Sequence, residues 1–354
     1  MQLGEFYKDK RVLITGHTGF KGSWLSRILS NMGAKVFGLS LMPSTTPNLF
    51  SYVKDSPNLS TTIADIRDLN VVTDVVKSAQ PDIIIHMAAQ PLVSVGYEDP
   101  VSTYETNVMG TVNILAAARS TNTIRSVVNV TTDKVYHNNE WCWGYREDDE
   151  LNGFDPYSNS KSCSELVTSC FVNSYFRDTL AVSTCRAGNV IGGGDFSENR
   201  IIPDCVRAAI AGDIMYLRNP NSTRPYQHVL EPLFAYLLVA ARQYEDINCS
   251  GSYNIGPSDS STINNVELVK LFKKYWGDSF RYSSSPVDSK FHETNYLKLD
   301  CSKIKTVFGW TPKLSIEDAI EKTILWTKQW CTGGKPLEVM DEQISEYIES
   351  FQEL

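Results

Sequence analysis

Short apolar runs alternate with longer segments of helical periodicity through the first half of the chain. The apolar runs are RVLITG, AKVFGLSL, TTIADI, PDIIIHMAA, SVVNVTT and LAVSTCRAGNV, which begin at residues 11, 34, 61, 81, 126 and 180. Runs of this length predict buried strands. Between the first two, WLSRILSNMG places Leu25, Ile28 and Leu29 on one face of a helix that ends at Gly33. Strand–helix alternation of this kind predicts an α/β fold with a doubly wound parallel sheet.

The pattern changes after about residue 190, beyond a second long helix predicted over TYETNVMGTVNILAAARS (103–120). There GGGD and the stretch RNPNSTRPYQHVLEP interrupt the alternation. We therefore expect a sheet domain over residues 1–188, to which the chain returns at about 228–256, a smaller cap-like domain formed by 189–227 and 257–335, and a helical tail over 336–354.

Composition excludes several classes of protein. A formal charge of −8 without a basic run argues against general nucleic-acid binding. The apolar stretch LFAYLLVAA (233–241) is far too short to span a bilayer, and the N-terminus lacks the layout of a signal peptide. The eight cysteines contain no CxxC pair and the five histidines are isolated, so we expect no disulfide framework and no metal site. A cytoplasmic protein that does not bind membranes is the expectation.

A glycine-rich turn follows the first predicted strand. It reads Gly16-His17-Thr18-Gly19-Phe20-Lys21-Gly22, and a helix comes directly after it. Glycines permit a tight turn and let backbone N–H groups approach a pyrophosphate, while the helix N-terminus favours negative charge. The spacing is GxxGxxG, and a merely permissive turn is the alternative. Its place between the first strand and the first helix favours a dinucleotide site.

The residues that would distinguish NAD from NADP are weakly informative. The second predicted strand ends in GLSLMPS. This segment contains neither an acidic residue that would hold the adenosine ribose nor a cation that would bind a 2′-phosphate. The missing cation favours NAD. Asp65, after the third strand, is equally compatible with an adenine contact and with an N-cap of the next helix. MAAQ (87–90) supplies small residues where the fourth strand must let a cofactor pass.

A second helix start carries a tyrosine and a lysine on one face. Asp155 is the expected N-cap and Pro156 the first helical residue, so Tyr157 and Lys161 lie four apart. A phenol titrates near ~10 in isolation. The Lys161 ammonium and the positive helix end are both expected to lower the pKa of Tyr157 and make it a base near neutrality.

TTDKVY (131–136) places Thr132, Asp133 and Lys134 at the carboxyl end of the fifth predicted strand. One interpretation is an exposed ion pair of little energetic worth. The other is a catalytic site. Adjacent side chains of a strand face opposite ways, so Asp133 and Lys134 can reach one substrate only if the strand has ended and the backbone turns.

The glycine turn, the Tyr157/Lys161 pair and Thr132 together resemble the extended short-chain dehydrogenase/reductase superfamily. Within it, seven motifs resemble the CDP-glucose 4,6-dehydratases: GHTGFKGSWL, TTDKVY, NNEWCWGYRE, DPYSNSK, RAGNVIGGGDF, RPYQHVLEP and NYLKLDCSK. The match runs from about residue 11 to 330. Thr131 and Val135 stand where other residues are expected, and the segment between Phe176 and Ala181 is shorter than usual.

The resemblance implies a redox-neutral lyase that uses NAD to convert CDP-glucose to CDP-4-keto-6-deoxyglucose for deoxysugar and surface polysaccharide (lipopolysaccharide O-antigen) biosynthesis. Tyr157 would take the proton of the sugar 4-hydroxyl while C4 gives a hydride to NAD. Asp133 would be the acid for the C6 hydroxyl, with its pKa raised by burial, and Lys134 the base at C5 or its electrostatic helper. The related dTDP-glucose enzymes carry a glutamate at the position of Lys134. A homodimer or higher homo-oligomer is implied, with helices 102–119 and 157–174 across a two-fold axis.

The same resemblance implies the ligand-binding residues, with NAD in the sheet domain and the nucleotide sugar in the cap-like domain. The cofactor set is Gly16, Thr18, Gly19, Phe20, Lys21, Gly22, Asp65, Ile66, Ala88, Ala89, Gln90, Asn107, Tyr157 and Lys161. The substrate set is Asn189, Arg200, Arg218, Arg224, His228 and Tyr296. A diphosphate calls for a bidentate cation, for which Arg224 is the first choice and Arg218 the second, against a bare surface arginine. Asn189 is equally compatible with a substrate contact and with a role in the turn into GGGD.

Three alternatives stay open at this point. A nucleotide-sugar 4-epimerase shares Thr132, Tyr157 and Lys161 but has no use for Asp133 and Lys134. A 4,6-dehydratase that uses another nucleotide would carry the same chemical site, since cytosine rests on resemblance alone. A non-catalytic dinucleotide-sensing protein of the same fold would need neither Tyr157 nor Lys161.

Overall fold

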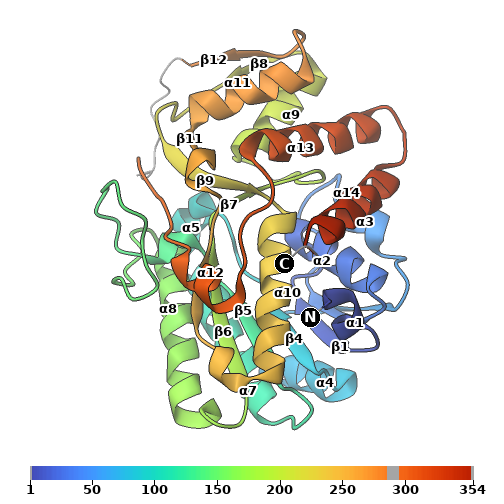
Figure 1. The fold of residues 1–354 in the computed structure, drawn as a ribbon, viewed down its shortest axis with the longest axis vertical. Helices are drawn as coiled ribbons and strands as arrows, with labels where there is room; N and C mark the ends of the chain where they lie inside the picture. Colours follow the sequence, from blue (N-terminus) through green and yellow to red (C-terminus); the bar gives the residue numbers. More distant parts are fainter. Residues whose placement is uncertain (1, 285–294, 352–354) are drawn as a thin grey trace.

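A seven-stranded parallel sheet forms the centre of the protein, as the computed structural model shows for residues 2–284 and 295–351 (Figure 1). The strand order is β10-β6-β5-β4-β1-β2-β3, and every neighbouring pair is parallel. The strands are β1 (Arg11–Thr15), β2 (Lys35–Ser40), β3 (Leu59–Ile63), β4 (Ile83–His86), β5 (Ser126–Val130), β6 (Ala181–Ala187) and β10 (Ser252–Ile255). The predicted doubly wound sheet is confirmed.

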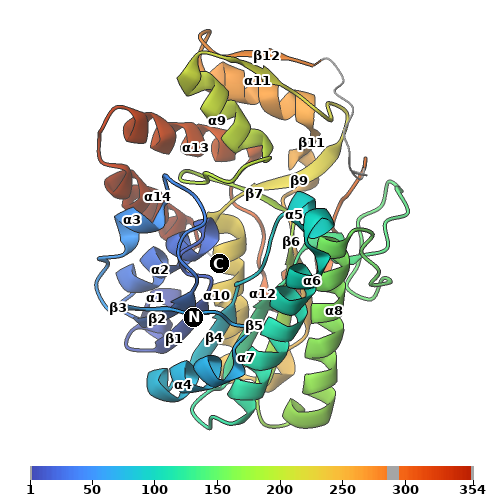
Figure 2. The same ribbon diagram turned by 180° about the vertical axis from the view of Figure 1, so that it is seen from behind.

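Helices cover both faces of this sheet (Figures 1 and 2). One face carries α2 (Phe20–Asn31) and α10 (Leu230–Glu245), and the other carries α4 (Leu69–Ala79), α7 (Gly110–Arg119) and α8 (Pro156–Phe171). Successive strand residues point to opposite faces: Val12 and Ile14 of β1 enter the first core, and Leu13 enters the second. Burial on both faces explains why the strands read as continuous apolar runs.

Three predicted elements have different bounds. The long helix over 103–120 is α6 (Pro100–Tyr104), a π-helical turn η1 (Glu105–Met109) and then α7. The third strand ends at Ile63, earlier than TTIADI suggests, because β3 is an edge strand with mostly exposed side chains. The run LAVSTCRAGNV divides at Gly188 into β6 and β7 (Asn189–Ile191), since a Cβ at Gly188 would lie 2.6 Å from the Pro225 carbonyl oxygen.

A smaller layer with its own core lies beyond the carboxyl edge of the sheet, at the top of Figure 1. It contains a three-stranded sheet of β7, β9 (Thr223–His228) and β11 (Thr262–Asn264), and a parallel pair of β8 (Ile214–Tyr216) and β12 (Arg281–Ser283). Helices α9 (Ile201–Ala211), α11 (Asn265–Trp276) and α13 (Ile316–Cys331) pack around them. Between these segments the chain returns to the large sheet through α10 and β10.

The C-terminal helix α14 (Pro336–Phe351) packs back on the main body. Arg27 of α2 forms an ion pair with Asp341 at 2.5 Å, and the Tyr347 hydroxyl donates to Glu231 at 2.7 Å. The shorter helices are α1 (Leu3–Tyr7), α3 (Phe50–Val53), α5 (Val93–Glu98) and α12 (Ser302–Phe308). Among the described residues no helix is long and apolar enough to cross a membrane. All eight cysteines are unpaired.

Candidate active site

The glycine-rich turn links β1 to α2 as predicted. Gly16 has a φ of +78°, which favours glycine. A Cβ on Gly16 would lie 2.8 Å from the backbone nitrogen of Ala88, and a Cβ on Gly22 would lie 2.1 Å from the Gly16 oxygen. Gly19 is the N-cap of α2, and no side chain caps this helix. The tight turn therefore leaves the first N–H groups of α2 available for an anion.

The predicted residues after β4 lie beside this turn. β1 and β4 are neighbours at the point where the strand order reverses, the usual place for a ligand crevice in such sheets. The backbone N–H groups of Met87 and Ala88 donate to Thr15 Oγ1, both at 3.1 Å, which fixes β4 against the start of the glycine turn. Ala88, Ala89 and Gln90 are all partly exposed here. The structure thus brings the two predicted halves of a dinucleotide site together.

Asn107 holds the end of β4 from the π-helical turn. Its Oδ1 accepts from the Gln90 N–H at 2.8 Å, and its Nδ2 donates to the Gln90 carbonyl at 3.1 Å and to Ser160 Oγ at 2.9 Å. The side chain is buried, so these three bonds use its polar atoms. Asn107 therefore contributes by positioning Gln90 and α8. π-turns of this kind occur often at functional sites.

Other predicted cofactor residues have neighbours that define their roles more narrowly. Thr18 Oγ1 donates to the Leu41 carbonyl at 2.8 Å and lies 2.8 Å from Ser40 Oγ, so it ties the glycine turn to the end of β2. Phe20 opens α2 and packs at the edge of the sheet core. Lys21 Nζ donates to the Tyr236 hydroxyl at 3.3 Å. Burial, with Lys161 and Arg200 nearby, lowers the pKa of Lys21 to about 7.

The alternative role of Asp65 as a helix N-cap is wrong. Asp68 caps α4, accepting from the backbone N–H groups of residues 70 and 71. Asp65 instead forms an ion pair with Arg67 at 2.7 Å, because the chain turns between them, and a hydrogen bond from Arg67 lowers the pKa of Asp65. Ile66 is buried against Gly110, where a Cβ would lie 2.4 Å from Ile66 Cδ1. The adenine contact of Asp65 stays a prediction.

Residues 131–136 form a turn, which we call the catalytic turn. β5 ends at Val130, and a 3₁₀ helix follows over Asp133–Val135, with Thr132 as its N-cap. Asp133 and Lys134 were expected to reach one substrate only if the strand ended before them, and the strand does end before them. The turn lies at the carboxyl edge of the sheet, where β5 is the neighbour of β4.

Asp133 is a buried acid with spare hydrogen-bonding capacity. Its side chain is 2% exposed. Thr132 Oγ1 donates to Asp133 Oδ1 at 3.0 Å, and within the described part of the chain Oδ2 is buried without a hydrogen-bond partner. Burial raises the pKa of Asp133, opposed by the nearby Lys134, by Thr132 and by Arg224. A raised pKa is what a carboxyl group that donates a proton requires, and the burial of Asp133 excludes an exposed ion pair.

The Tyr157/Lys161 pair is in place, but its electrostatics differ from the prediction. Asp155 caps α8 and Pro156 is its first residue, as predicted. Burial raises the pKa of Tyr157 to about 12, although Thr132 and Arg200 oppose the shift. Lys161 Nζ donates to the Val130 carbonyl at 3.1 Å, and burial lowers its pKa to about 8. The predicted lowering of the phenol pKa is therefore wrong for the protein alone, because desolvation outweighs the hydrogen bond with Thr132 and the charge of Arg200.

Two of the three predicted arginines lie near these groups. Arg200, the residue before α9, lies close enough to Tyr157 and Lys21 to influence both pKa values. Arg224 of β9 is buried and lies close enough to Asp133 to oppose its pKa shift. Arg218 is half-exposed and pairs with Asp204 at 3.0 Å on α9. The smaller layer therefore places Arg224 near Asp133 and Arg200 near Tyr157, and Arg218 is directed elsewhere.

The remaining predicted substrate residues are spread over the same layer. Asn189 opens β7 and is paired with β9, so it lies in a strand and not in the turn into GGGD. Tyr296 is partly exposed, and its backbone accepts from Asn138 at 3.0 Å. His228 is fully buried and packs edge-on against Trp24 at 6.0 Å between ring centroids. The structure does not bring His228 to the site, because its ring belongs to the core.

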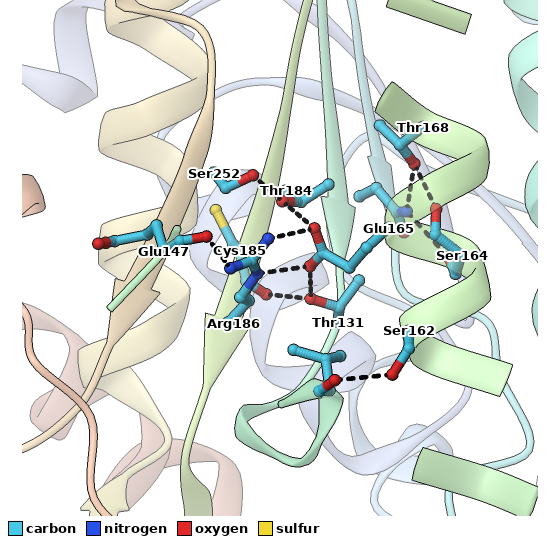
Figure 3. A network of polar contacts seen from close by, with 12 residues as sticks. Thr131, Glu147, Ser162, Ser164, Glu165, Thr168, Thr184, Cys185, Arg186 and Ser252 are labelled. Carbon is cyan, nitrogen blue, oxygen red and sulfur yellow. Dashed lines mark hydrogen bonds and ion pairs between the residues drawn. The ribbon is translucent and has the colours of Figure 1, made fainter. Parts of the chain in front are cut away.

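A buried ion pair behind the catalytic turn was not among the predicted residues (Figure 3). Glu165 of α8 and Arg186 of β6 are bound at 2.9 Å, with side chains 2% and 3% exposed. Glu165 also accepts from Thr131 Oγ1 at 2.5 Å. Its sequence signal is the position one helical turn after Lys161, which places both on one face of α8.

These residues fit a dinucleotide and a hydroxylated substrate. The glycine contacts leave no room for a side chain, and the start of α2 has no side-chain cap, so a pyrophosphate can approach the backbone. A threonine, a phenol, a buried carboxyl group and two arginines meet beyond it. Such a set can move protons to and from a sugar beside a hydride acceptor. Among the described residues no group of His, Cys, Asp and Glu side chains could hold a metal ion.

Comparisons with known proteins agree with this geometry. Residues 13–323 match the family model described as GDP-mannose 4,6 dehydratase. The CDP-glucose 4,6-dehydratase of Salmonella typhimurium is 44% identical over 350 residues, which cover 97% of this chain and 97% of that protein. The dTDP-glucose 4,6-dehydratase DesIV of Streptomyces venezuelae, solved with NAD, has a TM-score of 0.79 at 26% identity, covering 92% of this chain and 99% of that one. The Bacillus anthracis dTDP-glucose 4,6-dehydratase, also with NAD, has a TM-score of 0.76 at 25% identity and the same coverage.

Proposed function

The chain belongs to the GDP-mannose 4,6-dehydratase family, and from that premise we propose that it is an NAD-dependent hydro-lyase that converts CDP-glucose to CDP-4-keto-6-deoxyglucose. The large sheet holds NAD through the glycine turn and the end of β4. The smaller layer holds the nucleotide diphosphate through Arg200 and Arg224. CDP-glucose is the substrate of the relative with 44% identity.

The catalytic residues divide between two half-reactions. Tyr157 takes the proton of the C4 hydroxyl with help from Thr132, while Lys161 holds α8 to the end of β5. When bound, NAD would supply a reversible acceptor for the hydride that leaves C4 and returns at C6, and its positive charge would favour the phenolate of Tyr157. Asp133 donates a proton to the C6 hydroxyl, which leaves as water. Lys134 serves as the base for the C5 proton or sets the field around that base, and a proton returns to C5 when the hydride arrives at C6.

The buried Asp133 is the observation that favours a dehydratase over a 4-epimerase. An epimerase needs only the hydride-transfer residues Thr132, Tyr157 and Lys161. A protonated carboxyl group costs little to bury and has a proton to give. Among the described residues one of its oxygens has no hydrogen-bond partner, and the same turn carries Thr132, a neighbour of the phenol. This arrangement suits the departure of a hydroxyl group.

The test is incubation with CDP-, UDP-, GDP- and dTDP-glucose, with product mass as the readout. We expect loss of one water from CDP-glucose and little conversion of the other three. Unchanged mass with an inverted stereocentre would contradict the proposal in favour of an epimerase. Loss of water from another nucleotide sugar would support the proposed reaction but would show that the proposed substrate is wrong.

A non-catalytic sensor of dinucleotides is tested by Tyr157→Phe. We expect this variant to lose oxidation of the sugar while it still binds NAD, because only the transferable proton is removed. If every measurable property is unchanged, Tyr157 has no chemical task and the sensor gains support.

We also propose a homodimer formed through the helices on the second face. Val101, Met109, Leu166 and Tyr175 are large apolar or aromatic side chains that are 46–68% exposed, on the adjoining α6, η1, α8 and the turn after α8 (Figure 2). An exposed apolar face is typical of an interface. Light scattering should give twice the 39.7 kDa chain mass, and Met109→Glu with Leu166→Glu should give monomers. A wild-type monomer would contradict this part.

A cytoplasmic location completes the proposal, because a reducing compartment keeps cysteines as thiols. Fractionation with an antibody against the chain tests it, and recovery in a membrane or secreted fraction would contradict it.

A further inference from the structure

We propose that the buried Glu165–Arg186 pair is a positioning unit that holds the catalytic turn at both ends and thereby aligns Asp133 and Lys134 for loss of water. The proposal rests on the function proposed above. Both side chains of the pair are buried, so we infer that they act through the turn.

Glu165 holds the entry of the turn. Its carboxylate accepts from Thr131 Oγ1 at 2.5 Å, from Thr184 Oγ1 at 2.7 Å and from Arg186 Nε and Nη2 at 3.0 and 2.9 Å (Figure 3). Four charge-assisted bonds in a buried site give a well-defined orientation. Thr131 is the residue immediately before Thr132 and Asp133, so its hydroxyl transmits that orientation to the start of the turn.

Arg186 holds the exit of the turn. Its Nη1 donates to the Tyr136 hydroxyl at 2.8 Å and to the Glu147 carbonyl at 2.8 Å. The Tyr136 hydroxyl in turn donates to Asn254 Oδ1 at 2.6 Å, at the edge of the sheet in β10. Since the pair is neutral overall and its polar atoms are bonded, it can remain buried without a large penalty.

α8 adds two further contacts to the same segment. Lys161 Nζ donates to the Val130 carbonyl at 3.1 Å, just before the turn, and Ser162 Oγ donates to the Val135 carbonyl at 2.7 Å within it. The turn between Val130 and Tyr136 is thus bonded to α8 or to the ion pair at four positions. Asp133 and Lys134 lie between these four positions in the chain.

The two half-reactions should respond differently when this hold weakens. Tyr157 and Lys161 belong to α8 itself, whose start is fixed by the Asp155 cap. Asp133 and Lys134 depend on the turn for their place. Misplacement by about 1 Å can lower a rate by up to about a hundredfold. A looser turn should therefore slow elimination more than oxidation.

Thr131→Val and Thr184→Val form the matched pair that tests this. Each removes one hydroxyl donor to the same carboxylate and keeps the side-chain volume, but only Thr131 belongs to the turn. Purified, NAD-loaded enzyme is mixed with CDP-glucose, and reduced nicotinamide absorbance and product mass are followed in time. Amide hydrogen exchange of residues 131–136 is measured on the same proteins without substrate.

For Thr131→Val we expect reduced nicotinamide to accumulate, product formation to fall by about tenfold to a hundredfold and exchange in the turn to quicken. For Thr184→Val we expect a clearly smaller change in the partition between the two species and in exchange of the turn, because its lost hydroxyl lies outside the turn. Equal behaviour of the two variants, with wild-type enzyme still forming product, would overturn the proposal and leave the function intact. No dehydrated product from the wild type would instead overturn the function.

Tyr136→Phe keeps the proposal testable if Thr131→Val does not fold. It removes the exit contact of Arg186 with a change of one atom, and we expect the same accumulation of reduced nicotinamide. Normal partition in Tyr136→Phe would count against a hold at the exit.

Discussion

Asp133→Asn separates the two halves of the proposed reaction. The asparagine keeps the shape of the side chain and can still accept the hydrogen bond from Thr132. The second oxygen of Asp133 has no partner among the described residues, so the amide that replaces it breaks no bond there. We therefore expect a change in the free energy of unfolding below about 1 kcal/mol.

The catalytic effect should be much larger than the effect on stability. An amide cannot supply a proton to the C6 hydroxyl. General acid catalysis contributes about 10²- to 10⁴-fold, so we expect the barrier to loss of water to rise by about 3 to 5 kcal/mol. Oxidation at C4 does not use this proton and should continue.

Rapid mixing of NAD-loaded enzyme with CDP-glucose measures both steps, through nicotinamide absorbance and product mass. The variant should accumulate reduced nicotinamide, whereas the control Asp148→Asn, an exposed acid in the same region, should behave as wild type. Normal turnover of Asp133→Asn would refute the assignment of the acid. Equal loss of oxidation and elimination in a folded variant would place Asp133 in the earlier step.

Further predictions concern the glycine-rich turn, the Glu165–Arg186 pair and Glu231 at the start of α10. Gly22→Ala places a Cβ 2.1 Å from a carbonyl oxygen of its own turn, so NAD affinity measured by calorimetry should fall by at least about tenfold. The control is Gly4→Ala, whose Cβ would have no atom within 4 Å. Equal NAD affinities of the two variants would contradict the role of the turn. Glu165→Ala leaves the Arg186 charge buried and should cost about 3–5 kcal/mol in denaturant unfolding, while Glu165→Leu with Arg186→Met should recover most of it; no recovery would show that the charge is not the cause. Burial raises the pKa of Glu231 from 4.5 to about 7, so the free energy of unfolding should fall by up to about 3 kcal/mol as pH rises through that interval; Glu231→Gln should remove this slope, and an unchanged slope would contradict it.

The sequence was sufficient for the layered fold, because strand burial on both faces leaves a strong local signal. The apolar runs at β1, β4 and β5 predicted the parallel sheet, and the glycine turn predicted a dinucleotide site after its first strand. Bounds were less predictable where tertiary contacts decide them. The π-turn at Asn107 depends on bonds to Gln90 and Ser160, which are distant in sequence, and the break at Gly188 depends on the approach of Pro225.

The site residues divide in a similar way. Motif spacing predicted that Tyr157 and Lys161 lie at the start of a helix and that Asp133 follows the end of a strand, since each lies at an element boundary with a recognisable signal. Their chemical roles rest on the resemblance and stay predictions. The pKa shifts could not be predicted from motif spacing. The pKa of Tyr157 rises because burial in the folded protein outweighs the effect of its charged neighbours. Glu165 and Arg186 are 21 residues apart on different elements, so their pairing emerges only when α8 packs against β6.

The most direct test of the central claim is the mass of the nucleotide sugar after incubation of the wild-type protein with CDP-glucose labelled with deuterium at C4. The proposed mechanism predicts a product lighter by one water that retains the deuterium, now at C6, because the same hydride returns within one active site. A product of unchanged mass, or a dehydrated product without the label, would contradict it.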